Sequence, residues 1–153
     1  MMWNRIKLPY IFERMLAFSI PMRDCVLVLE DEALHFISLS PELEVTTDKE
    51  HAEEYLDIYD NEPNIFNYRG KLYKMLGLYG GEPILSDIYG NQLNLDAERE
   101  LLEITDIEGK VIQEIQYFNL SGDWAYTTFS PDGEMLAIGV PYDLFLFRRS
   151  LTK

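Results

Sequence analysis

The sequence has one cysteine, Cys25, in 153 residues, and its longest apolar runs are only a handful of residues long. A single cysteine excludes an internal disulfide, so we expect the chain in a reducing compartment, the cytoplasm. Apolar runs this short exclude a membrane-spanning helix, and the charged residues near the N-terminus are not typical of a secretion signal. We therefore expect a cytoplasmic protein with no membrane partner, folded as a single domain over residues 1–153.

The sequence also lacks the short motifs that mark most catalytic and metal sites. It contains no G-x-S-x-G, H-E-x-x-H, C-x-x-C or EF-hand pattern, and the glycine-rich stretch at residues 77–81 has no G-K-[ST]. His51 and Glu54 lie one helical turn apart, but a metal site needs more than two ligands. His35 lies inside an apolar run and is interpreted as a strand residue. We expect no catalytic residue, no metal and no cofactor.

Basic residues are scarce in one part of the chain. The net charge is −14, from 27 acidic and 13 basic residues, and residues 24–62 contain 13 of the acids but a single base, Lys49. An acidic surface repels phosphate backbones, so we do not expect a nucleic-acid partner. Two interpretations of the segment remain open: a solubilising face, or a docking surface whose electric field accelerates encounter with a basic partner.

Strand patterns dominate what is present. Residues 15–47 alternate apolar runs of five to seven residues with turns that contain proline, aspartate or glutamate. Residues 101–115 form two such runs around Glu108 and Gly109, as in a hairpin. Residues 124–147 form three runs, and the turn Ser130-Pro131-Asp132-Gly133 separates the first two. These patterns predict an all-β fold built as an antiparallel meander.

Two stretches have helical spacing instead. In residues 48–59, Ala52, Tyr55, Leu56 and Tyr59 follow the i, i+3, i+4, i+7 pattern of an amphipathic helix. Residues 96–102 form a second, shorter candidate that begins with Asp96 as a capping residue. We therefore expect one or two short helices among the strands.

The last segment resembles a blade of a WD-repeat-type β-propeller. The resemblance rests on a strand that ends in Phe-Ser-Pro-Asp-Gly at residues 129–133, on Leu-Ala-Ile-Gly at residues 136–139, and on Asp143 before a strand that ends in Phe147. It covers residues 121–149, and looser versions of the same order occupy residues 15–47 and 83–118. The resemblance implies propeller-like antiparallel β-meander blades.

Chain length limits how such blades can assemble. Propellers close with four to eight blades of about 40 residues each, and 153 residues hold fewer than four. The alternatives are an unusually small propeller, an open stack of propeller-like meanders, or an incomplete ring that a second copy or another chain completes. We expect residues 6–12 to supply a fourth strand to the last blade and so protect its edge.

The fold resemblance and the charge favour a non-enzymatic protein-interaction module, a scaffold or adaptor. The alternative is a small acidic inhibitor or immunity-type protein that neutralises a basic toxin or nuclease, and a third hypothesis is a hydrolase with its site in a propeller-like channel. Tyrosines crowd the acidic segment and the residues after it. Two interpretations of them remain open: packing in a propeller-like core, or an exposed recognition surface, since exposed tyrosines anchor many interfaces. The predicted contacts with a basic protein partner are Glu50, Glu53, Glu54, Asp57, Tyr55, Tyr59 and Tyr79.

Overall fold

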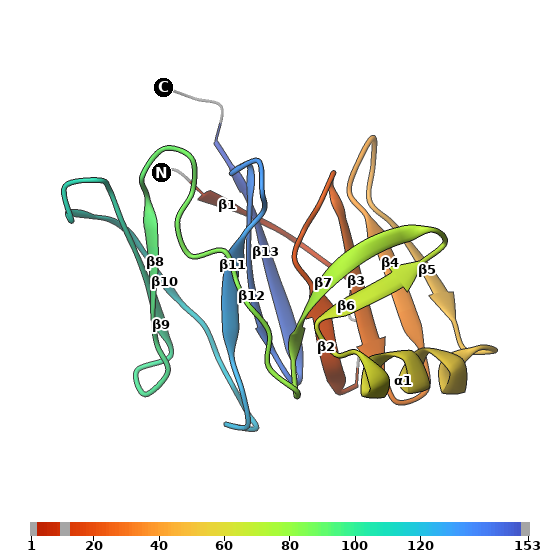
Figure 1. Ribbon diagram of the computed structural model, residues 1–153. Helices are drawn as coiled ribbons and strands as arrows, with labels where there is room; N and C mark the ends of the chain where they lie inside the picture. The colour runs from red at the N-terminus through yellow and green to blue at the C-terminus, as the bar shows by residue number, and fades with distance from the viewer. Residues whose placement is uncertain (1–2, 10–12, 151–153) are drawn as a thin grey trace.

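The structure, a computed structural model, describes residues 3–9 and 13–150. Antiparallel strands dominate these residues, which form three sheets of four, three and six strands and one helix. The predicted all-β class is therefore confirmed. Figure 1 shows the four-stranded sheet in the middle, with the three-stranded sheet on one side and the six-stranded sheet on the other.

The six-stranded sheet contains the strands expected between residues 15 and 47. Its strand order is β5-β4-β3-β2-β7-β6, and all neighbours are antiparallel. The β6–β7 hairpin crosses over the face of β3 and β4 (Figure 1), where Tyr68 stacks on Phe36 with ring centroids 5.6 Å apart. The strands are β2 (Met15–Ser19), β3 (Cys25–Glu30), β4 (Leu34–Ser38), β5 (Glu44–Asp48), β6 (Ile65–Tyr68) and β7 (Lys71–Gly77).

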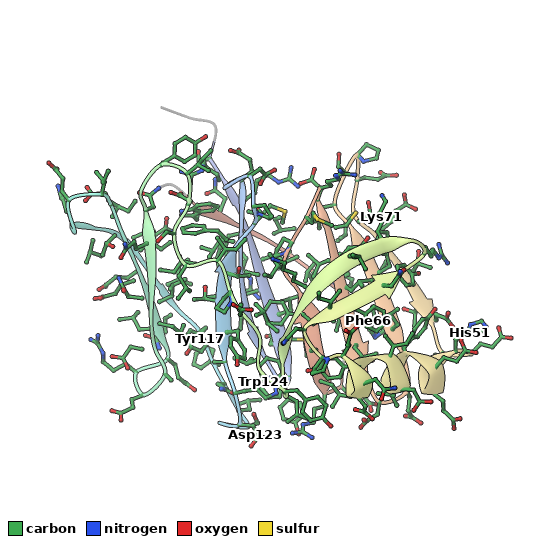
Figure 2. All side chains as sticks on the ribbon, in the orientation of Figure 1. His51, Phe66, Lys71, Tyr117, Asp123 and Trp124 are labelled. Atoms are coloured by element: carbon green, nitrogen blue, oxygen red, sulfur yellow. The ribbon has the colours of Figure 1, made fainter. Side chains whose placement is uncertain are left out.

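The helix α1 (Ala52–Asn61) lies at the end of this sheet, below β6 in Figure 1. It confirms the first predicted helix, although it begins later than expected because Asp48 still pairs with Leu34 as the last residue of β5. Its apolar stripe faces the sheet, and Tyr59 is buried there beside Phe66. In Figure 2 Phe66 lies between α1 and the strands, while His51 lies at the outer end of the helix.

The four-stranded sheet has the order β1-β13-β12-β11. The N-terminal strand pairs with the last strand, as expected, but it spans residues 3–6 rather than 6–12. Of the expected range, residues 10–12 lie outside the described residues. The strands are β1 (Trp3–Ile6), β11 (Tyr126–Phe129), β12 (Met135–Val140) and β13 (Asp143–Arg149).

The turn between β11 and β12 has the geometry expected of Ser-Pro-Asp-Gly. The N–H of Gly133 donates to the carbonyl of Ser130 at 3.0 Å, which closes the turn. Gly133 has a φ of 75°, a left-handed conformation that favours glycine. The Asp132 carboxylate accepts hydrogen bonds from the Ser130 hydroxyl and the Glu134 N–H, which hold the turn rigid.

The three-stranded sheet contradicts the second predicted helix. Asp96 ends β8 and pairs with Leu101, the first residue of β9, so residues 96–102 form a hairpin. The Asp96 carboxylate accepts bonds from the backbone N–H and the Nε of Arg99 at 3.2 and 2.7 Å, which stabilises the turn. The Glu108–Gly109 turn joins residues 101–105 to residues 111–116 as a second hairpin, as expected. The strands are β8 (Gln92–Asp96), β9 (Leu101–Thr105) and β10 (Val111–Gln116).

The middle sheet is buried on both faces, which explains its continuous apolar sequences. One face packs against the six-stranded sheet through residues such as Ala137 and Phe18, and the other packs against the three-stranded sheet through residues such as Ile138 and Ile104. All six residues of β12 are buried. A Cβ on Gly139 would overlap the Phe18 ring, so glycine allows the two sheets to approach closely at this point.

None of the described residues belongs to a helix that is long and apolar enough to cross a membrane.

Candidate functional site

A hydrogen-bonded carboxylate joins the end of β5 to the start of α1. Asp48 accepts bonds from the Tyr55 hydroxyl at 2.8 Å, from the His51 backbone N–H at 3.1 Å and from the His51 ring at 3.0 Å. The Tyr55 bond is the main reason why the pKa of Asp48 falls to about 2. Burial, followed by the bond to Asp48, raises the pKa of Tyr55 to about 12, and Asp48 also raises the pKa of His51. The carboxylate therefore holds the helix in a defined position against the sheet.

Three of the four predicted acidic contacts lie on this helix, and the fourth, Glu50, lies two residues before its first residue. Glu50, Glu53, Glu54 and Asp57 are all exposed. We call these four residues the acidic face. Since no described base lies within the helix, the acidic face presents one sign of charge to solvent.

The three predicted tyrosines differ in exposure. Tyr79 is 53% exposed and stacks on Tyr59 with ring centroids 5.2 Å apart. Tyr55 is half-buried, and its hydroxyl is bonded to Asp48. Tyr59 is 1% exposed, and burial raises the pKa of its hydroxyl. Tyr59 is therefore a core residue that supports Tyr79 and is not itself a surface contact.

Two adjoining pockets extend the acidic surface beyond the helix. Asp31, Glu32 and Lys49 line both pockets, which have volumes of 240 and 460 Å³. The β3–β4 turn therefore contributes acids that motif reasoning did not single out, although the run Glu30-Asp31-Glu32 is a visible signal. We call the combined feature the acidic groove. Its charged lining consists of six acids, Glu13, Glu30, Asp31, Glu32, Glu50 and Glu53, and two bases, Arg14 and Lys49, beside His35.

A chain of three hydrogen-bonded side chains connects the acidic groove to β5. Glu30 Oε1 lies 2.6 Å from Nε2 of His35, and Nδ1 of His35 lies 2.8 Å from the Thr47 hydroxyl. The other oxygen of Glu30 accepts the Glu13 N–H at 2.7 Å. His35 is 3% exposed and belongs to β4, as expected for a strand residue. Glu30 and His35 line the first pocket, whereas Thr47 lines neither of the two pockets.

The remaining motif residues have structural surroundings. The His51 ring is bonded to Asp48, and no group of three or more His, Cys, Asp or Glu among the described residues is arranged to hold a metal ion. Burial is the main cause that raises the pKa of the Cys25 thiol, and the neighbouring Asp24 adds to it in the same direction. A raised thiol pKa lowers the reactive thiolate fraction. The Cys25 thiol is therefore poorly suited to act as a nucleophile.

A second charged cluster lies where β1 and β13 meet the loop after residue 86. Asp87 has a side-chain exposure of 0% and forms an ion pair with Arg149. The Arg149 guanidinium lies 4.5 Å from the ring centroid of Trp3 and 4.6 Å from that of Tyr89. Sequence reasoning missed this cluster because its members are far apart in the chain. The cluster fastens the N-terminal strand and a loop to the last strand.

No protein-family model matches the chain, and no curated protein matches it in sequence.

Proposed function

We propose that the protein is a non-enzymatic interaction module in which propeller-like β-meander sheets carry an acidic surface that binds a basic region of a partner protein. The observation that carries the proposal is the joining of the acidic face and the acidic groove into one surface at the α1 end of the six-stranded sheet. The groove and the face share Glu50 and Glu53, and six acids against two bases line the groove.

The surface has the properties that electrostatic steering requires. Most of its acids lie on a helix or in the β3–β4 turn, and the Asp48 bonds fix the helix to the sheet. Rigid charges of one sign raise the rate at which an oppositely charged partner finds the correct orientation. Tyr79, exposed and supported by Tyr59, supplies an amphipathic contact of the kind that contributes much of the binding energy in interfaces.

A second candidate function uses the same surface. An acidic inhibitor or immunity-type protein would neutralise a basic toxin or nuclease by covering its cationic substrate site. The two candidates differ in the partner and agree on the residues that bind it. Inhibition of the captured protein's own activity distinguishes the inhibitor from the adaptor.

The experiment neutralises the acidic face in one variant, Glu50→Gln, Glu53→Gln, Glu54→Gln and Asp57→Asn. A matched control neutralises four exposed acids elsewhere, Glu82→Gln, Glu98→Gln, Glu108→Gln and Glu114→Gln, so both variants have the same net charge. Partners captured from a lysate of the producing cells are identified by mass spectrometry. We expect the first variant to lose the basic partners and the control to keep them, since surface changes of this kind cost less than about 0.5 kcal/mol of stability each.

Equal capture by wild type and both variants refutes the docking role of the acidic face. The aromatic-rich stretch at residues 66–79 then becomes the next surface to test. If both variants lose the basic partners equally, the loss comes from the change in net charge alone, and this result also contradicts the proposal.

A further inference from the structure

Most sheet edges in the described part of the chain are covered. At the β11 edge, the N–H of Phe129 donates to the carbonyl of Ile84 at 2.8 Å. At the β8 edge, the N–H of Leu93 donates to the carbonyl of Leu85 at 2.9 Å. One extended segment, residues 84–85, therefore supplies partners to two sheets. Covering an edge in this way prevents it from pairing with another chain.

Three further edges are interrupted or flanked by other features. At β1, the side chain of Gln113 accepts the N–H of Trp3 at 3.0 Å and donates to its carbonyl at 3.1 Å. At β10, the register shifts between Val111 and Gln113, and such a bulge disturbs the pairing surface. At β6, α1 runs alongside the strand (Figure 1). These devices are ones that soluble proteins use to protect sheet edges.

The β5 edge differs from the other five. β5 pairs with β4 over five consecutive residues without a register shift. Its sequence, Glu-Val-Thr-Thr-Asp, contains neither proline nor lysine and has three β-branched residues in the middle. Among the described residues, none forms a hydrogen bond with the backbone of β5 on the side away from β4.

The register shows which backbone groups are left open. The N–H of Leu39 bonds to the carbonyl of Asp24, which identifies the hydrogen-bonded pairs of the β3–β4 ladder. Hydrogen-bonded and non-bonded pairs alternate along an antiparallel ladder. By this alternation the backbones of Ile37 and His35 bond to β3, so the backbone of Phe36 between them bonds to its β5 partner, Thr46. The backbones of Val45 and Thr47, on either side of Thr46, therefore point away from β4. Two N–H and two C=O groups of Val45 and Thr47 thus face outward in the spacing that an added strand requires.

The charge around this edge favours one kind of occupant. Residues 42–54 contain six acids and one base, Lys49. Glu44 lies on the strand itself, and the acidic groove begins at Lys49, directly after its last residue. A segment that lies along β5 is therefore close to carboxylates over its whole length. Lysine or arginine side chains on the added segment complement these charges.

We propose that β5 is the docking edge for an extended basic segment of a partner protein, which adds to the six-stranded sheet as a further strand. Backbone bonds to Val45 and Thr47 provide affinity, and the acids around β5 and in the acidic groove provide selectivity for basic sequences. The inference rests on the proposed function and deepens it, because it assigns the mode in which the basic partner binds.

The test uses a defined probe, the acetylated and amidated peptide Lys-Thr-Lys-Val-Lys-Thr-Lys-Val. In the free protein, the amide hydrogens of Val45 and Thr47 should exchange rapidly with solvent. On saturation with the peptide, their exchange should slow at least about tenfold, as for amides that enter a ladder. The Thr46 amide, which faces β4, should change little and serves as an internal control. Binding without protection of Val45 and Thr47 overturns the proposal.

Two altered peptides separate backbone pairing from charge. Methylation of the four central backbone nitrogens removes donors on both sides of the peptide and should weaken binding at least about tenfold. Replacing each lysine with glutamine removes only the charge and should also weaken binding. If methylation has no effect but glutamine weakens binding, strand addition is wrong and the proposed function stands. If only methylation weakens binding, the edge binds strands but the acidic surface does not select for charge, which contradicts the proposed function.

A pair of variants tests the edge from the protein side. Val45→Pro removes an outward N–H and leaves the bonds to β4 intact, because proline is tolerated on edge strands. Val45→Ala loses the same packing against the core but keeps the N–H. We expect Val45→Pro to bind the peptide at least about tenfold more weakly than Val45→Ala. Equal binding by the two folded variants overturns the proposal. If β5 pairs instead with a second copy, Val45→Pro converts a dimer to a monomer in sedimentation, and the proposed occupant is wrong.

Discussion

Replacing Gly139 with alanine tests whether the middle and six-stranded sheets pack as closely as described. A Cβ at this position would overlap the ring of Phe18, which is itself completely buried. Gly139 does not have a positive φ, so alanine adds no backbone strain and the effect comes from the overlap alone. Overpacking a core costs about 1–3 kcal/mol, and the lower entropy of the unfolded alanine chain returns about 0.4–1 kcal/mol.

Because the added Cβ would overlap three atoms of the Phe18 ring, we expect a cost in the upper half of this range, about 2–3 kcal/mol. The expected net loss is then about 1–2.6 kcal/mol, or about 2–10 °C in Tm for a chain of this size. Urea unfolding followed by circular dichroism measures the loss. Phe18→Leu removes the ring edge, so in the double variant the Gly139→Ala penalty should shrink by at least about 1 kcal/mol. A Gly139→Ala loss below about 0.5 kcal/mol, or a penalty that Phe18→Leu leaves unchanged, refutes the described packing.

Three further predictions concern the Asp87–Arg149 ion pair, the Asp48 carboxylate that holds α1, and the absence of a metal-ligand cluster among the described residues. Asp87→Asn leaves the Arg149 charge without its buried partner and should cost about 3–5 kcal/mol in urea unfolding; a loss below 1 kcal/mol contradicts the buried pair. Because the pKa of Asp48 is lowered from the reference value to about 2, its contribution to stability is complete above about pH 4 and is lost as the pH falls toward 2. Asp48→Asn should remove most of the pH dependence of the unfolding free energy between about pH 4 and pH 2. An unchanged pH dependence would contradict the role of Asp48 in holding α1 against the sheet. EDTA should leave the Tm unchanged, and a large fall would reveal a structural metal.

The strands of residues 15–47 and 124–147 were predictable because each apolar run ends at a turn residue with its own local chemistry. The turn at Ser130–Gly133, for example, closes through bonds among its own residues. The helix at residues 52–61 was predictable for the same reason, since its apolar stripe has helical spacing within the segment itself. Local chemistry is visible in a single sequence.

Residues 96–102 show where local reasoning fails. Their composition favours a helix, but Leu102 is completely buried in the contact with the middle sheet, and the pairing of Asp96 with Leu101 forms a hairpin. Tertiary burial overrides intrinsic helix propensity in such segments. The sequence pattern contains no information about the sheet that covers Leu102.

The candidate site was predictable only in part. Clustering of acids in residues 24–62 indicated the acidic face, but the acidic groove requires Glu13 and the β3–β4 turn to meet the start of α1. The open edge of β5 depends on which strand ends the sheet, and the burial of Tyr59 depends on the β6–β7 hairpin folding over β3 and β4. These are long-range contacts, which composition and periodicity do not encode.

The most direct test of the account measures how the association rate constant with a captured basic partner depends on salt. Charges on the acidic face are screened over about 8–10 Å at physiological ionic strength, so the wild-type rate constant should fall at least about tenfold from low to physiological salt. The variant Glu50→Gln, Glu53→Gln, Glu54→Gln and Asp57→Asn should associate slowly with a weak salt dependence, while the matched control should behave as wild type. The same rate and salt dependence in the acidic-face variant and in wild type would contradict the account.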